Sequence, residues 1–202
     1  IRGFGQSDCP ADPQACDMQN CVGDLVALMQ ALGESAAVIV GHDLGAWVAY
    51  AAAQRRPDLF RALALLNTLV TPREPHKPSE LWKMLAAGTG QRFYQQYFQA
   101  PGEAEAVMDA DIRKTLRSIF YSISGDAVGE QRWRLFVEQG ETLMDTVCDP
   151  ERFPGWLHDT ALDYYVGQYS RHGFTAPLSH YRARDRNWAQ SAVLDGLKLQ
   201  QP

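Results

Sequence analysis

The chain has 202 residues, of which 46% are hydrophobic and 21% charged, with a formal net charge of −5. This is the composition of an ordinary soluble globular protein, long enough for one domain with an insertion, and its 19 scattered lysines and arginines argue against a nucleic-acid partner. The sequence contains neither a signal peptide nor the roughly 20-residue apolar run of a membrane span, and its four cysteines are expected to be reduced thiols in a cytoplasmic protein.

Helix and strand signals alternate in the first third of the chain. A helical pattern over 17–33 is followed by an apolar run over 36–41, an alanine-rich helical segment from 45 to about 57, and a second apolar run over 61–68. Short continuous apolar runs are typical of strands buried on both faces of a sheet. The order predicts parallel strands joined by crossover helices, an α/β fold. Because two strands are few for such a sheet, we expect the sequence to be the middle of a larger domain.

The character of the sequence changes at about residue 70. The segment TPREPHKP (71–78) has three prolines in eight residues, which indicates a boundary. The following hundred or so residues are helical in pattern and rich in aromatic side chains, and NWAQSAVLDGL (187–197) predicts a last helix. The predicted divisions are a partial core over 1–69, a helical lid over 70–185 and a truncated return helix to the core over 186–202.

A carboxylate occupies the tight turn in VIVGHDLGAW, residues 38–47, between a predicted strand and a predicted helix. Gly41 and Gly45 flank Asp43 in the pattern of a nucleophile turn, and we expect both glycines to avoid Cβ clashes between strand and helix. Such a turn exposes its central residue at a helix N-terminus, where negative charge is favoured. A carboxylate there suggests attack on an alkyl carbon, giving an ester that water then cleaves. The alternative is that Asp43 only caps the helix; His42 is interpreted as structural.

Four segments of the chain carry a more specific signal: RGFGQSD (2–8), VIVGHDLGAW (38–47), YFQAPGEAE (97–105) and GFTAPLSHYRARDRNW (173–188). Together they resemble the soluble epoxide hydrolase branch of the α/β-hydrolase superfamily, which implies an α/β-hydrolase core with a helical lid. The resemblance places Asp43 at the nucleophile and Tyr97 and Tyr181 at the paired lid tyrosines that hydrogen-bond the epoxide oxygen. A phenol can donate a hydrogen bond, and then a proton, to the alkoxide that ring opening produces.

The resemblance also implies the reactants: a small apolar epoxide and water, converted to a vicinal diol through an alkyl-enzyme ester, with no metal or organic cofactor. The backbone N–H of Leu44 is expected to be an oxyanion-hole donor. Ester hydrolysis in this family needs a histidine and an orienting acid that follow the lid, and we assign neither in this sequence. We therefore expect the chain as given to be unable to turn over and to remain trapped as the ester.

Two other interpretations stay open. One is a haloalkane or haloacid dehalogenase-like hydrolase with the same aspartate turn, although Leu44 stands where haloalkane dehalogenases have a halide-binding tryptophan. The other is a non-catalytic fragment that binds small apolar ligands or a partner through its aromatic lid. Unpaired strand edges would also make the chain poorly soluble alone. The sequence gives no prediction of oligomeric state.

Overall fold

The structure is a computed structural model that describes residues 1–68 and 73–202. The first elements are η1 (Pro13–Cys16), α1 (Met18–Leu32), β1 (Ala37–His42), α2 (Leu44–Arg55) and β2 (Phe60–Leu66). The central elements are α3 (Pro78–Leu85), β3 (Arg92–Phe93), α4 (Tyr94–Tyr97), α5 (Glu103–Met108), α6 (Ile112–Ser122), η2 (Gly129–Gln131), β4 (Phe136–Val137), η3 (Leu143–Thr146) and α7 (Asp159–Tyr169). The last elements are α8 (Thr175–Arg182), α9 (Arg184–Gln190) and η4 (Ala192–Leu194).

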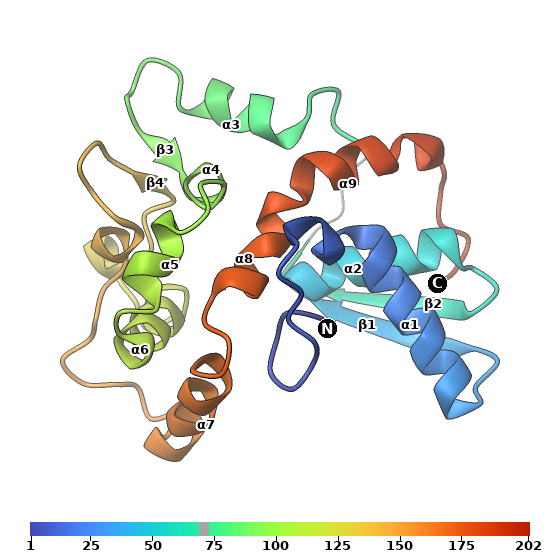
Figure 1. Cartoon of the computed structure of the whole chain (residues 1–202), viewed down its shortest axis with the longest axis horizontal. Helices are drawn as coiled ribbons and strands as arrows, with labels where there is room; N and C mark the ends of the chain where they lie inside the picture. The colour runs from blue at the N-terminus through green and yellow to red at the C-terminus, as the bar shows by residue number, and fades with distance from the viewer. Residues whose placement is uncertain (69–72) are drawn as a thin grey trace.

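Two groups of elements make up the molecule (Figure 1). The first is a two-stranded sheet with α1 and α2, and the second is a set of short helices from α3 to α7. Helix α8 lies between the two groups, and α9 continues from it over the core. None of the helices in the described part of the chain combines the length and apolarity that crossing a membrane requires.

The core forms as the alternating pattern predicts. Helix α1 begins after Asp17, whose side chain accepts a hydrogen bond from the N–H of Asn20, and ends at Gly33 with φ 69°. Strands β1 and β2 pair in parallel, with Val38 opposite Ala62. Because parallel neighbours need a crossover connection, α2 runs back along the sheet between them. The predicted α/β arrangement is confirmed, with strand ends within two residues of the predicted ones.

The sheet is covered on one face only within the described residues. Ala37 and Ile39 pack against the cluster formed by α1 and α2, whereas Val38 and Val40 on the opposite face are 53% and 61% exposed. The prediction that this strand is buried on both faces is therefore wrong for the chain as it stands, because no described element lies over that second face. The apolar run carries the pattern of a doubly buried strand, but burial needs a neighbouring layer.

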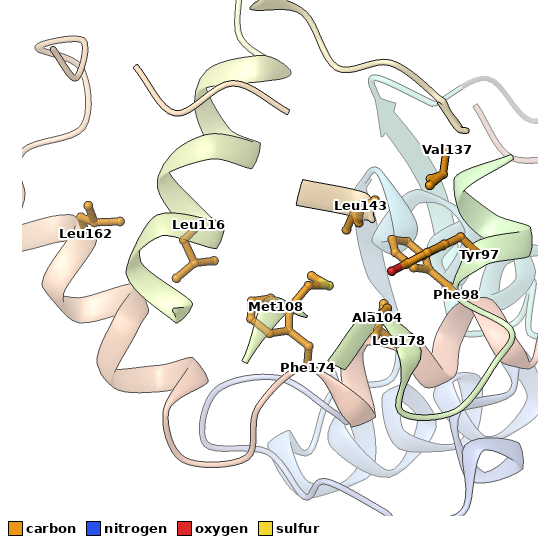
Figure 2. Packing of buried hydrophobic residues seen from close by; sticks show 10 residues of the cluster. All are labelled: Tyr97, Phe98, Ala104, Met108, Leu116, Val137, Leu143, Leu162, Phe174 and Leu178. Atoms are coloured by element: carbon orange, nitrogen blue, oxygen red, sulfur yellow. The ribbon is translucent and has the colours of Figure 1, made fainter. Parts of the chain in front are cut away.

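The segment from α3 to α8 has its own apolar centre, which we call the lid cluster. It contains Tyr97, Phe98, Ala104, Met108, Leu116, Val137, Leu143, Leu162, Phe174 and Leu178 (Figure 2). A short antiparallel pair, β3 with β4, joins two of its loops. The helical prediction for this segment missed that pair, because strands of two residues are too short to show an alternating pattern.

The boundaries of the predicted lid are only partly visible. The first, at residues 69 and 70, lies outside the described residues. The last helix was predicted over 187–197, but α9 begins at Arg184 and a short η4 follows it. The helix docks on the core: Arg186 Nε lies 2.6 Å from Asp17 Oδ2, and Asn187 Oδ1 accepts a 2.7 Å hydrogen bond from the N–H of Met18. These contacts attach α9 to the first turn of α1.

Candidate active site

The site begins with the backbone of the turn between β1 and α2. Asp43 has φ 52° and ψ −122°, a conformation that residues with a side chain rarely adopt. Two hydrogen bonds fix it: the N–H of Asp43 donates to Leu66 O at 3.3 Å, and its carbonyl accepts from the N–H of Ala46 at 2.9 Å. The sheet on one side and the helix on the other thus hold the strained residue at the carboxyl end of β1.

The two glycines flanking Asp43 are not equivalent. A Cβ added to Gly41 would lie 2.3 Å from the carbonyl oxygen of Gly45 and 2.7 Å from the Cα of Ala46. A Cβ added to Gly45 would meet no described atom within 4 Å. The expectation that glycine is needed for close strand–helix packing is therefore confirmed at Gly41 and wrong at Gly45.

The Asp43 carboxylate is exposed and sits at the N-terminus of α2. Its Oδ1 accepts a 2.6 Å hydrogen bond from the N–H of Leu44, so the side chain does cap the helix. No described residue donates a hydrogen bond to Oδ2. Capping and nucleophilic attack are therefore compatible: one oxygen is held by the helix while the other stays available.

Two phenols from different lid elements come together where the charge of this carboxylate reaches them. Tyr94, at the start of α4, and Tyr181, on α8, lie with ring centroids 6.2 Å apart, edge to face. Burial raises the pKa of both phenols, and the negative charge of Asp43 raises it further. Both groups are thus protonated hydrogen-bond donors near neutral pH. Tyr94 Oη accepts from Gln95 Nε2 at 2.8 Å, which leaves its hydrogen free to donate.

Tyr97 does not join this pair. Its side chain is 1% exposed within the lid cluster, and its phenol oxygen points toward Leu143 (Figure 2). The Arg92 guanidinium lies 4.6 Å from the centre of its ring. Burial raises the pKa of Tyr97, and a hydrogen bond from the Leu143 backbone opposes that shift, whereas Asp43 has no part in it. The structure therefore places Tyr94, three residues before Tyr97, beside Tyr181, whereas Tyr97 lies inside the lid cluster.

A buried ion pair and two hydrogen bonds join α8, which carries Tyr181, to the segment that follows the Tyr94 helix, α4. Arg182 on α8 contacts Glu105 on α5 at 2.7 Å, with side chains 6% and 10% exposed. Arg182 Nε also donates to the carbonyl of Phe98 at 2.9 Å, and Gln99 Nε2 donates to the carbonyl of Tyr181 at 3.1 Å. The segment following α4 is therefore held against α8 on both sides of Tyr181, which keeps the two rings in a fixed relation.

An arginine that the sequence analysis did not single out lies beside the phenols. The Arg184 guanidinium sits 5.1 Å from the ring centre of Trp47, which is one helical turn past Asp43 on α2. Both residues line a cavity of about 640 Å³ whose lining also includes Leu44, the neighbour of Asp43, but not Asp43, Tyr94 or Tyr181 themselves. The sequence gives no signal for Arg184, because it is one of three arginines in YRARDRNW. Only the structure shows that the other two, Arg182 and Arg186, form ion pairs elsewhere.

Among the described residues, no histidine ring hydrogen-bonds the Asp43 side chain, whose hydrogen bond comes from the N–H of Leu44. His42 is exposed next to Asp43 at the end of β1. His180 is buried, with Nε2 2.9 Å from the carbonyl of Arg2, and burial lowers its pKa. Within residues 1–68 and 73–202, no group of three or more His, Cys, Asp or Glu side chains is placed to hold a metal ion.

Known proteins match the chain along its whole length. Residues 1–124 match the model of the alpha/beta hydrolase fold family. Epoxide hydrolase A of Mycobacterium tuberculosis is 33% identical over 202 residues, covering 100% of this chain and 62% of that protein. Epoxide hydrolase 3 of Siraitia grosvenorii is 32% identical over 206 residues, covering 100% of this chain and 61% of that protein.

Solved structures give the same result. An epoxide hydrolase from an endophytic Streptomyces superimposes with a TM-score of 0.94 at 38% identity, covering 100% of this chain and 61% of that one. Epoxide hydrolase A from Mycobacterium thermoresistibile gives a TM-score of 0.90 at 34% identity, with 100% and 62% covered. The chain thus spans about three fifths of the length of these relatives. Since the matching family model covers more than half of its residues, the chain belongs to the alpha/beta hydrolase fold family.

Proposed function

We propose that this chain carries the ring-opening step of an epoxide hydrolase. One observation carries the proposal: two lid phenols, Tyr94 and Tyr181, meet 6.2 Å apart where the charge of Asp43 acts on both. A carboxylate whose charge reaches a pair of protonated phenols can attack an epoxide carbon while the phenols stabilise the oxygen that leaves that carbon. The relatives of this chain named as epoxide hydrolases support the same chemistry.

The hydrogen bond at Leu44 distinguishes the two oxygens of Asp43. Oδ1 accepts from the N–H of Leu44, so we assign the attack on the epoxide carbon to Oδ2. The new bond joins Oδ2 to that carbon, and the carbon–oxygen bond of the ring breaks. Oδ1 becomes the carbonyl oxygen of the ester, already next to a backbone donor. The same N–H would then stabilise the oxyanion that forms when water attacks the ester.

The phenols complete the step from the opposite side. Both are protonated near neutral pH, because burial and the charge of Asp43 raise their pKa. They hydrogen-bond the epoxide oxygen, and one of them gives its proton to the alkoxide as the ring opens. We retain Asp43 and Tyr181 in their predicted roles, and we assign the first lid phenol to Tyr94 instead of Tyr97.

This assignment places the site at the junction of the proposed divisions of the chain. Asp43 belongs to the core of residues 1–69, whereas Tyr94 and Tyr181 belong to the lid of residues 70–185. The return segment, 186–202, docks on α1 through Arg186. A substrate held between core and lid is attacked from one side and protonated from the other, as displacement at carbon requires.

The test isolates the half-reaction that these residues carry. The purified chain is incubated with styrene oxide, and intact-mass spectrometry follows the gain of one substrate molecule. We expect a single adduct that Asp43→Asn abolishes. The double change Tyr94→Phe, Tyr181→Phe should slow its formation by about 100-fold or more, the usual contribution of general acid catalysis. Tyr97→Phe is the matched control and should form the adduct at the original rate.

The remaining outcomes separate the competing functions. Rapid alkylation by a chloroalkane with release of chloride, but none by styrene oxide, would indicate a dehalogenase. An adduct that forms equally fast without both phenols would remove their proposed role. Binding of styrene oxide without any adduct would indicate a non-catalytic ligand-binding protein. Several turnovers to diol by the pure chain would contradict the expectation that it stops at the ester.

A further inference from the structure

We propose that Arg184 makes this site selective for epoxides that carry a carboxylate a few bonds from the ring, an inference that rests on the function proposed above. The predicted substrate was a small apolar epoxide. An arginine beside the reacting groups changes that expectation, because its guanidinium is a fixed positive charge that binds carboxylates through two parallel hydrogen bonds.

The position of Arg184 places its charge within reach of a bound substrate. Arg184 is the first residue of α9 and lies three residues after Tyr181, which is in the last turn of α8. Its guanidinium lies 5.1 Å from the ring centre of Trp47. Trp47 follows Asp43 by four residues on α2, a rise of about 6 Å along the helix. The guanidinium and the two phenols also affect one another's pKa values. A group only a few bonds from the reacting carbon would therefore meet Arg184.

Arg184 lacks an acidic partner within the described part of the chain. Its two arginine neighbours in sequence are both paired, Arg182 with Glu105 and Arg186 with Asp17. For Arg184 the structure gives only the face of Trp47 and the two neutral phenols. Burial lowers the pKa of Arg184, yet an arginine stays protonated in a protein. A desolvated cation that no described carboxylate neutralises favours an anionic ligand.

The cavity that Arg184 lines is positively charged in an acidic protein. Its lining includes the basic residues Arg55, Arg73, Arg184 and Lys198 against the acidic residues Glu74 and Asp195. The excess is two positive charges, whereas the chain as a whole carries −5. Such a cavity concentrates anions and repels cations. With a volume of about 640 Å³ it has room for a drug-sized ligand.

The experiment compares two epoxides that differ in charge alone. The probes are 4-(oxiran-2-yl)benzoate and its neutral amide, 4-(oxiran-2-yl)benzamide, and intact-mass spectrometry gives the rate of adduct formation for each. We expect the wild-type chain to prefer the acid by about tenfold or more, the effect of one charge-assisted hydrogen-bonded pair. Arg184→Met should abolish that preference, and Arg184→Lys should retain part of it. Arg113→Met, which removes an exposed arginine paired with Asp163, should leave the preference unchanged.

A second measurement separates this inference from the proposed function. Calorimetry with 3-phenylpropanoate and 3-phenylpropanamide tests recognition without any reaction. If neither epoxide forms an adduct but the acid binds more tightly than the amide in an Arg184-dependent way, the proposed function fails and recognition by Arg184 stands. If both epoxides react and the wild type shows no preference for the acid, the function stands and the inference is overturned.

Two further outcomes also decide the matter. If Arg184→Met slows both probes equally, Arg184 assists the phenols instead of the substrate carboxylate, and the inference is wrong. If circular dichroism shows that Arg184→Met does not fold, Arg184→Gln takes its place. The wild-type preference for the acid is then expected to be lost in Arg184→Gln. Absence of a preference in the wild type overturns the proposal whatever the variants do.

Discussion

The sharpest physical test of the turn uses its two glycines, because they differ in one measurable respect. In Gly41→Ala the added methyl would lie 2.3 Å from the carbonyl oxygen of Gly45 and 2.7 Å from the Cα of Ala46. Ordinary contact starts at 3.4 Å, so the strand and the helix must separate by about 1 Å at a site where neither neighbour is a flexible side chain. Overpacking of this kind typically costs about 1–3 kcal/mol, and we expect the upper end here.

Gly45→Ala is the matched control for this change. It adds the same methyl group two residues past Asp43, in α2, where no described atom lies within 4 Å. Alanine replaces glycine within a helix with a gain of about 0.5–1 kcal/mol. The two variants should therefore differ in unfolding free energy by about 4 kcal/mol, with opposite signs relative to the wild type.

Urea denaturation followed by circular dichroism measures both effects on the same chain. The adduct assay with styrene oxide adds a functional measure, because separating β1 from α2 displaces Asp43 from the phenols. We expect Gly41→Ala to slow adduct formation and Gly45→Ala to leave the Asp43 backbone in place. Equal stabilities for the two variants would refute the argument that Gly41 alone is dictated by close packing.

Two more predictions concern the lid. Burial alone would raise the pKa of Glu105, but the hydrogen bonds from Arg182 and from the backbone bring it below its ordinary value. That stabilisation is complete above the unfolded pKa of about 4.3 and is lost as the pH falls through the lower folded value. Glu105→Gln should therefore cost about 3 kcal/mol near neutral pH and progressively less below pH 4, by urea denaturation at each pH. Tyr97→Phe should cost about 1 kcal/mol by the same measurement, because its phenol is buried against Leu143; an unchanged stability would contradict its placement.

The assignment of the first lid phenol to Tyr94 instead of Tyr97 shows where sequence reasoning stopped. Tyr94 and Tyr97 are three residues apart on one helical turn, so they share a side of the helix and spacing cannot separate them. Their surroundings come from distant parts of the chain: Tyr181 and Trp133 lie against Tyr94, whereas Leu143 and Arg92 hold Tyr97. Only Arg92 among these is close in sequence to either one.

The strand, the turn and the helix around Asp43 were predictable from the sequence, because local signals determine them. An apolar run, a tight glycine-flanked turn and an alanine-rich helix each act over a few residues. The depth of burial of β1, the position of Tyr97 and the presence of Arg184 beside the phenols were decided by the tertiary structure. Each of these depends on contacts between segments that are many residues apart, and short-range patterns carry no information about which distant surface a side chain will meet.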